Sequence, residues 1–364
     1  MTAAIQQMFP CRQCGAKLEY QPGTSAQRCP YCGAENAIEH SAETIHELDY
    51  NAVLADAANT AETIDVITVK CTACGAESTK PPNVTAGQCP FCGADIVATG
   101  SSVKRIKPKA LLPFDIDHKR ARDLFKEWIR SLWFAPNALR KLARQDSPIN
   151  GLYCPYWTYD THVTTHYTGM RGDDYWDTET YTTRENGQTV TRTRQVRRTH
   201  WTPASGMVFN QFDDVLVVAS ESLPRKFAQA LEPWDLEKLV PYQDAYLAGF
   251  RAESYQVDLP IGFERAKEIM APTIHQTICS DIGGDRQQVS SQDSNYADIT
   301  FKHVLLPVWL SAYRYRNKIY RFLVNARTGE VQGERPWSWA KITLAVLAGC
   351  ALAGGIAYWI AQSQ

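Results

Sequence analysis

The clearest helical pattern in the polar part of the chain lies at residues 118–134. Apolar side chains recur there every three or four positions, so they fall on one face of a helix. Asp117 stands directly before this segment, where an aspartate can accept a hydrogen bond from the first helical turn. We therefore expect an amphipathic helix from His118 to about Phe134. Pro136 is expected to begin a second short helix over 137–144.

Strand patterns follow this helix. Residues 151–169 alternate polar with aromatic side chains, and 181–201 contain two runs rich in Thr, Val and Tyr, which is typical of β-strands. Asn186-Gly187 separates these two runs, and that dipeptide favours a two-residue β-turn. The pattern predicts a β-hairpin centred on this dipeptide, followed by short helical pieces at 223–231 and 241–250.

The same order of elements then recurs. Residues 262–282 have a helical pattern, and 303–336 read as a series of strands. The segment LLPVWLSAYRY at 305–315 resembles LYCPYWTYDTH at 152–162 in the order of its apolar, proline and tryptophan positions. The sequence therefore predicts an α+β body over 101–336, with a partly repeated unit of one helix and an antiparallel sheet.

The C-terminal segment is apolar on all sides. Residues 342–360 contain no charged side chain, and nineteen helical residues span about 28 Å, close to the ~30 Å of a bilayer core. Aromatic residues flank the segment, while Arg335 and Lys341 precede it. We expect one transmembrane helix at 340–361, with the long N-terminal part in the cytoplasm. A buried core helix is the other interpretation of this segment.

Small residues recur every four positions along this predicted helix, at Ala345, Gly349 and Ala353. Such a face suits close packing against a second helix, so self-association through it is one possibility. Solitary spans are also rich in glycine and alanine, and the pattern alone leaves the two interpretations open.

Cysteines in Cys-x-x-Cys pairs mark two sites near the N-terminus. Both have fourteen residues between their pairs, and each cysteine of the second site follows its counterpart by 60 residues. The candidate ligands are Cys11, Cys14, Cys29 and Cys32 in the first site and Cys71, Cys74, Cys89 and Cys92 in the second. The repeat predicts two zinc ribbons, at 9–35 and 67–98, joined by an acidic segment at 36–66.

Four thiolates complete a tetrahedral zinc shell, so both predicted Zn²⁺ ions are structural. Disulfides and an iron–sulfur cluster are the competing interpretations. The first ten residues contain no long apolar run, and a segment that is not exported stays in a reducing compartment. The acidic segment reads either as a solvated linker or as a short docking helix that includes Tyr50 and Val53.

Charge is distributed unevenly, although the formal net charge is only −1. Residues 1–100 carry five basic and eleven acidic side chains, a net of −6, whereas 101–150 carry twelve and five, a net of +7. A zinc ribbon that binds nucleic acid needs a basic surface, so the acidic ribbons favour contact with protein instead. The basic stretch reads as a solvated face, or as a contact for anionic lipid or an acidic partner.

The sequence contains no motif of catalytic residues, and we expect a protein without enzymatic activity. The phosphate-loop pattern GxxxxGK[ST] is absent, so no nucleotide-driven motor is predicted. His162 and His166 are four residues apart, so they lie on the same face of one predicted strand, and we interpret them as exposed hairpin residues. We interpret Cys154 as a small core residue.

Several longer motifs resemble one family. The double Cys-x-x-Cys ribbon, LLPFDID, SLWFAPNAL, LVPYQDAYLAGFRAESYQVDL, SDIGGD and FKHVLLPVWLSAYRY are similar to bacterial TFIIB-type zinc-ribbon proteins, which are often labelled as primosomal or replication-factor-Y relatives. The resemblance covers nearly the whole chain and implies that the eight cysteines ligate zinc. Some membrane-anchored members are encoded beside flotillin-like (SPFH) or phage-shock-type proteins, which implies a role in recruiting such partners.

These observations predict an adaptor held in the bacterial cytoplasmic membrane by one C-terminal span. Its ribbons and body would bind cytoplasmic proteins such as an SPFH or flotillin-like protein, in membrane organisation or envelope stress. The alternative is a membrane-tethered protein that binds nucleic acid through the ribbons and the basic stretch at 101–150.

Overall fold

The computed structural model describes residues 9–39, 41–56, 61–73, 75, 77–79, 86–89, 91, 94–97, 101–136, 149–185, 188–315 and 318–362. Within these residues the chain forms a mixed α+β structure with small N-terminal sheets, a large central sheet and one apolar helix at the C-terminal end. This architecture confirms the predicted fold class at that level.

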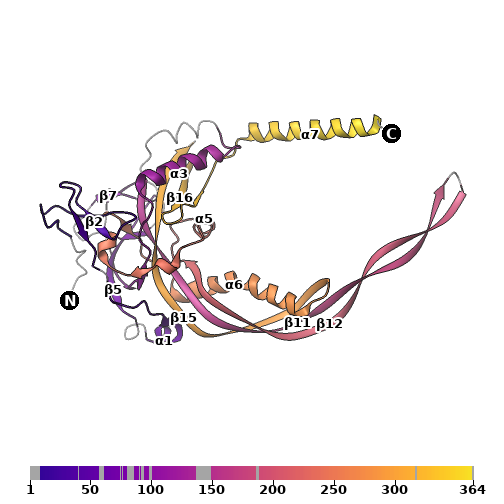
Figure 1. Cartoon of the computed structure of the whole chain (residues 1–364), viewed down its shortest axis with the longest axis horizontal. Coiled ribbons are helices and arrows are strands. Elements are labelled where there is room, and N and C mark those ends of the chain that lie inside the picture. The colour runs from indigo at the N-terminus through magenta and orange to yellow at the C-terminus, as the bar shows by residue number, and fades with distance from the viewer. Residues whose placement is uncertain are drawn as a thin grey trace.

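Three long antiparallel strands form the centre of the body. They are β11 (Asn150–Glu185), β12 (Gln188–Val218) and β15 (Arg286–Tyr315), and β11 lies between the other two. Together they make a strongly curved sheet (Figure 1). Shorter strands complete the nine-stranded sheet: β4 (Leu48–Asp49), β10 (Ala110–Leu111), β13 (Val240–Pro241), β14 (Arg251–Ala252), β16 (Lys318–Asn325) and β17 (Val331–Gly333).

The predicted hairpin is present, and its two strands are much longer than the runs on either side of the predicted turn. Pairing between β11 and β15 ends at Gly172 and Arg286, while β11 and β12 continue as a two-stranded arm to Glu185 and Gln188. The arm projects away from the body (Figure 1). The pairing leaves two residues between the strands, as predicted, and these two residues, 186–187, lie outside the described part.

The helices begin close to their predicted positions. Helix α3 (His118–Ser131) is capped by Asp117, whose Oδ1 accepts from the backbone N–H of Arg120 at 2.7 Å. Helix α6 (Leu259–Ile282) begins three residues before the predicted start because a proline in its first turn favours helix initiation there. It lies along one side of the curved sheet (Figure 1). The predicted short helix at 137–144 lies outside the described residues.

The two similar segments at 152–162 and 305–315 do not belong to separate sheets. Leu152 pairs with Val308 and Cys154 with Leu306, so the segments are antiparallel neighbours in the central sheet. The order of one helix followed by one β-hairpin does occur twice along the chain, but the two hairpins share one hydrophobic core. The reason is that these segments are buried, so each needs an apolar neighbour.

The remaining elements surround this sheet. Helix α1 (Tyr50–Ala55) buries Tyr50 and Val53 against the body, which favours the docking-helix interpretation of the segment between the ribbons. The other elements are β1 (Glu19–Tyr20), β2 (Ala26–Arg28), β3 (Glu35–Ala37), β5 (Thr63–Lys70), β6 (Glu77–Thr79), β7 (Ala86–Gln88), β8 (Asp95–Val97), β9 (Ser101–Ile106), helix α5 (Arg225–Gln229), the 3-10 turns η1 (Leu236–Lys238) and η2 (Asp244–Leu247), and helix α7 (Trp339–Gln362).

Candidate metal centre

Two tight turns present the cysteines of the first site. In the turn at Cys11, Gly15 N–H donates to the Cys11 carbonyl at 2.8 Å, and Cys11 N–H donates to the Ala16 carbonyl at 2.7 Å. The turn at Cys29 repeats this arrangement: Gly33 N–H donates to the Cys29 carbonyl at 3.0 Å. Both glycines have a positive φ, 73° for Gly15 and 74° for Gly33, a conformation that favours glycine.

The two turns bring four sulfur atoms together. Cys11 Sγ lies 3.6 Å from Cys32 Sγ, and Cys14 Sγ lies 3.5 Å from Cys29 Sγ. All four sulfurs lie within 4.8 Å of one another. Zinc–sulfur bonds of about 2.3 Å at tetrahedral angles place two sulfurs about 3.8 Å apart, whereas a disulfide needs about 2.05 Å. The cluster therefore has the spacing of a tetrahedral metal site, and it can hold a metal ion.

Backbone N–H groups favour the thiolate form at this cluster. Hydrogen bonding from the backbone of Cys32, with a smaller contribution from Tyr31, lowers the pKa of the Cys29 thiol to about 6 despite its burial. The backbone of Cys14 and Gln13 likewise lowers the pKa of Cys11. The backbone of Ala16 and Ala34 acts in the same direction on Cys14 and Cys32, but the pKa of both thiols is raised, by the Cys29 sulfur at Cys14 and by burial together with the Cys29 sulfur at Cys32. Because metal ions bind the thiolate, the folded turns favour the metal-binding form at Cys11 and Cys29.

The second site repeats the backbone of the first wherever both are described. Gly75 N–H donates to the Cys71 carbonyl at 2.8 Å, and Cys89 N–H donates to the Ala94 carbonyl at 2.8 Å. Strands β7 and β8 pair with the same register as β2 and β3, shifted by 60 residues. Cys71 and Cys89 are buried, whereas the predicted ligands Cys74 and Cys92 lie outside the described residues.

The first ribbon is packed against the body rather than merely tethered to it. The Tyr20 ring is buried between Tyr246 and Phe250, and its hydroxyl donates to the Phe114 carbonyl at 3.2 Å. Gln27 Nε2 donates to the Ala245 carbonyl at 2.8 Å. These contacts fix the orientation of the cysteine cluster relative to the central sheet.

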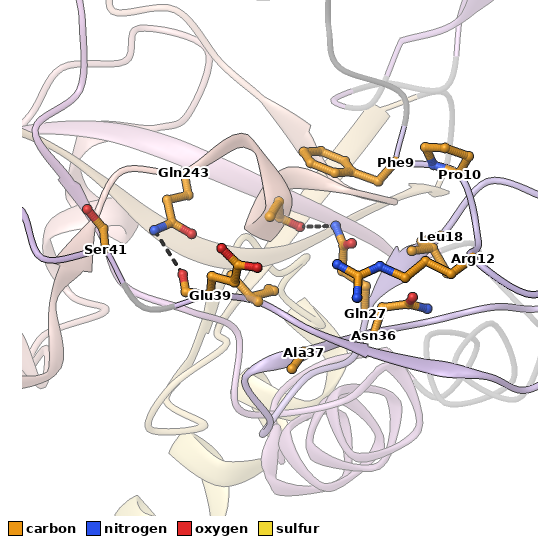
Figure 2. A pocket seen from close by; sticks show the side chains of 12 residues that line it. Phe9, Pro10, Arg12, Leu18, Gln27, Asn36, Ala37, Glu39, Ser41 and Gln243 are labelled. Carbon is orange, nitrogen blue, oxygen red and sulfur yellow. Dashed lines mark hydrogen bonds between the residues drawn. The ribbon is translucent and has the colours of Figure 1, made fainter.

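A cavity of about 460 Å³ lies beside this junction. The first ribbon and η2 form its walls, which combine apolar and polar side chains. Figure 2 shows Arg12 on one side of the cavity and Glu39 on another, with Gln243 donating to the Glu39 carbonyl at 3.2 Å. Sequence reasoning did not find this cavity, because its lining comes from segments about 200 residues apart.

A carboxylate cluster was also missed. Asp160, Asp213 and Asp214 converge where the pairing of β11 with its neighbours is interrupted. Lys302 Nζ lies 2.7 Å from Asp214 Oδ1 and 2.9 Å from Glu47 Oε1. The lysine supplies the positive charge at this cluster, so its contacts are those of a structural ion-pair network.

Helix α7 contains a segment long and apolar enough to cross a membrane, Trp339–Ile356, and the rest of the described structure buries none of it. Its apolar side chains are exposed, including Leu344, Leu352 and Ile356. By length and composition this is a candidate membrane span. It projects from the body as a separate rod (Figure 1).

Comparison with known proteins finds a similar protein in Bacillus subtilis (strain 168), described as the uncharacterized protein YdjG. The two sequences are 29% identical over 258 residues, which are 69% of this chain and 70% of YdjG. No protein-family model matches the chain. No solved structure matches it.

Proposed function

We propose that this protein is a membrane-anchored adaptor of the bacterial TFIIB-type zinc-ribbon family, without enzymatic activity. The observation that carries the proposal is a cysteine cluster with metal-site spacing, docked on a body whose chain continues into an exposed apolar helix. An adaptor needs these parts: a rigid surface for a partner and an attachment to a membrane.

The metal in this proposal is Zn²⁺, held by Cys11, Cys14, Cys29 and Cys32. Four sulfurs fill the tetrahedral shell and leave no position for a substrate, which supports a structural role. The second ribbon would hold a second Zn²⁺ through its own cysteines. The repeated backbone hydrogen bonds and strand register support this assignment.

The anchor is α7, inserted in the bacterial cytoplasmic membrane with the N-terminal body in the cytoplasm. Arg335 and Lys341 precede the uncharged stretch at 342–360, which supports this orientation by the positive-inside tendency. Self-association through Ala345, Gly349 and Ala353 is compatible with this model, because these three residues are exposed on α7.

The partner contact is proposed at the outer edge of β3, next to the cavity. Cys29 N–H donates to the Ala34 carbonyl and Ile38 N–H to the Ser25 carbonyl, so every second pair of this ladder is hydrogen-bonded. Glu35 and Ala37 belong to the alternate pairs, and their backbone N–H and C=O point away from β2. No described strand pairs with that edge. An extended segment of a partner can add there as a strand, with one side chain in the cavity beside Arg12.

The resemblance of the motifs to membrane-anchored zinc-ribbon proteins makes an SPFH or flotillin-like protein the proposed partner. The test is a cross-linked pull-down of the full-length chain from its native membrane, with nuclease treatment. Arg12→Glu, at the cavity, is compared with Tyr31→Ala, which alters an exposed side chain at the other cysteine turn of the same ribbon.

The proposal expects an SPFH or flotillin-like protein with the wild type and with Tyr31→Ala, and its loss with Arg12→Glu at unchanged zinc content. Equal recovery with both variants would contradict the proposed contact. Recovery of only nucleic-acid-processing proteins, lost on nuclease treatment, would instead favour the tethered nucleic-acid-binding function.

A further inference from the structure

The start of α7 is fastened to a distant part of the body, the C-terminal end of α3. Lys341 Nζ donates to the carbonyls of Trp133 at 3.1 Å and Ala135 at 2.8 Å. Ser338 N–H donates to the Phe134 carbonyl at 2.8 Å. Trp133 and Ala135 lie in the turn that follows α3, so Lys341, in the first turn of α7, ties this turn to the start of the apolar helix.

Three exposed tryptophans surround this junction. The exposed fraction is 73% for Trp133, 52% for Trp337 and 78% for Trp339. Water-exposed indoles are costly in a soluble surface, whereas the boundary between headgroups and hydrocarbon suits their apolar ring and polar N–H. Trp133 is separated from the apolar helix by about 200 residues of sequence, so its place here follows only from the fold.

The charge at this junction is positive. Arg130 lies in the last turn of α3, and the Arg335 guanidinium lies 4.3 Å from the Trp337 ring centroid. The acidic neighbour Glu334 accepts a hydrogen bond from the backbone N–H of Arg321, which lies in β16. With Lys341, three basic side chains therefore stand against one carboxylate within the segments 128–135 and 334–341. Anionic lipid headgroups complement this charge.

We propose that the C-terminal end of α3 is a second membrane contact, in which Trp133 enters the interface and Arg130, Arg335 and Lys341 bind anionic phospholipid headgroups. The inference rests on the proposed insertion of α7 and adds a lipid-binding surface on the body itself. We choose a lipid surface as the binding partner because the apolar helix begins at this junction. The helix can enter a bilayer only if the junction lies at the bilayer surface.

The contact has a mechanical consequence for the adaptor. A single span alone leaves the body free to rotate relative to the membrane, whereas a second contact at Trp133 restricts this rotation. The ribbons and the cavity then have a defined orientation relative to the membrane. This lowers the entropy cost of binding a partner protein that is also attached to the membrane.

The experiment places the photoreactive residue p-benzoylphenylalanine at one position at a time in the full-length chain. The protein is reconstituted in phosphatidylcholine vesicles that contain phosphatidylglycerol, irradiated, and analysed for lipid adducts by mass spectrometry. Position 133 is the test and position 339, at the start of α7, reports insertion. Position 31 is the matched control, because Tyr31 is an aromatic residue with 83% exposure on the first ribbon.

The inference predicts adducts at 339 and 133 and none at 31, with phosphatidylglycerol enriched among the 133 adducts above its share of the lipid. Adducts at 339 without adducts at 133 would overturn the inference and leave the anchor intact. Adducts at 133 without phosphatidylglycerol enrichment would overturn the role of the basic side chains. No adduct at 339 would overturn the insertion of α7 and the inference with it.

Discussion

Tyr20 is the residue whose removal should loosen the first ribbon from the body. Only 4% of its surface is exposed, its ring packs edge-on to Tyr246 with centroids 5.3 Å apart, and its hydroxyl donates to the Thr24 carbonyl at 2.6 Å and to that of Phe114. Truncation of a buried aromatic residue costs about 3–5 kcal/mol. Tyr20→Ala should therefore lower the free energy of opening of the ribbon by about this amount, and Tyr20→Phe by about 1 kcal/mol.

The assay is native-state hydrogen exchange of the full-length chain in mild detergent, read on the backbone amides of residues 9–38. The zinc content should stay unchanged, because Tyr20 is not a ligand and the cysteine turns are local. Tyr31→Ala serves as the control and should change the opening free energy by no more than about 0.5 kcal/mol. Equal effects of Tyr20→Ala and Tyr31→Ala would refute the packing of the ribbon on the body.

Two further predictions concern the central sheet. A Cβ at Gly262 would overlap the Tyr159 hydroxyl oxygen, so Gly262→Ala should destabilise the body by about 1–3 kcal/mol in chemical denaturation. The change of its exposed neighbour, Ile261→Ala, should have little effect. Burial, together with a hydrogen bond to Glu47, raises the pKa of Asp160 to about 7. Burial opposes ionisation of Glu47 as well, but hydrogen bonds, of which that from Asp160 is the strongest, lower its pKa to about 2. Because the folded state holds the Asp160 proton more tightly than the unfolded chain, this group's contribution to stability falls as the pH rises from about 5 to 7. Asp160→Asn should flatten that slope in denaturation curves taken across this range, and an unchanged slope would show that another group causes it.

The first cysteine cluster and the starts of α3 and α6 could be predicted because their signals are local. The cysteine turns depend on six consecutive residues each, and the cap at Asp117 and the apolar face of α3 lie within one segment. By contrast, the first half of β15, from Arg286 to Ile299, is mostly polar and has no strand pattern of its own. It is a strand because β11 provides a paired edge, which only the tertiary structure reveals.

The same distinction explains the sites that sequence reasoning missed. The carboxylate–lysine network joins Glu47, Asp160, Asp214 and Lys302 from four separate segments, and no spacing rule connects them. Trp133 lies within the amphipathic helix predicted from His118 to about Phe134. Its helix ends at Ser131, however, and the indole is turned outward beside the start of α7.

The central claim is that two closed cysteine sites each hold one structural zinc ion. It is tested most directly by the metal content of the full-length chain, purified in mild detergent without added metal, together with Cys11→Ser and Cys71→Ser. The account predicts about two zinc ions per chain in the wild type and about one in each variant. One zinc ion or none in the wild type, or iron in its place, would contradict it.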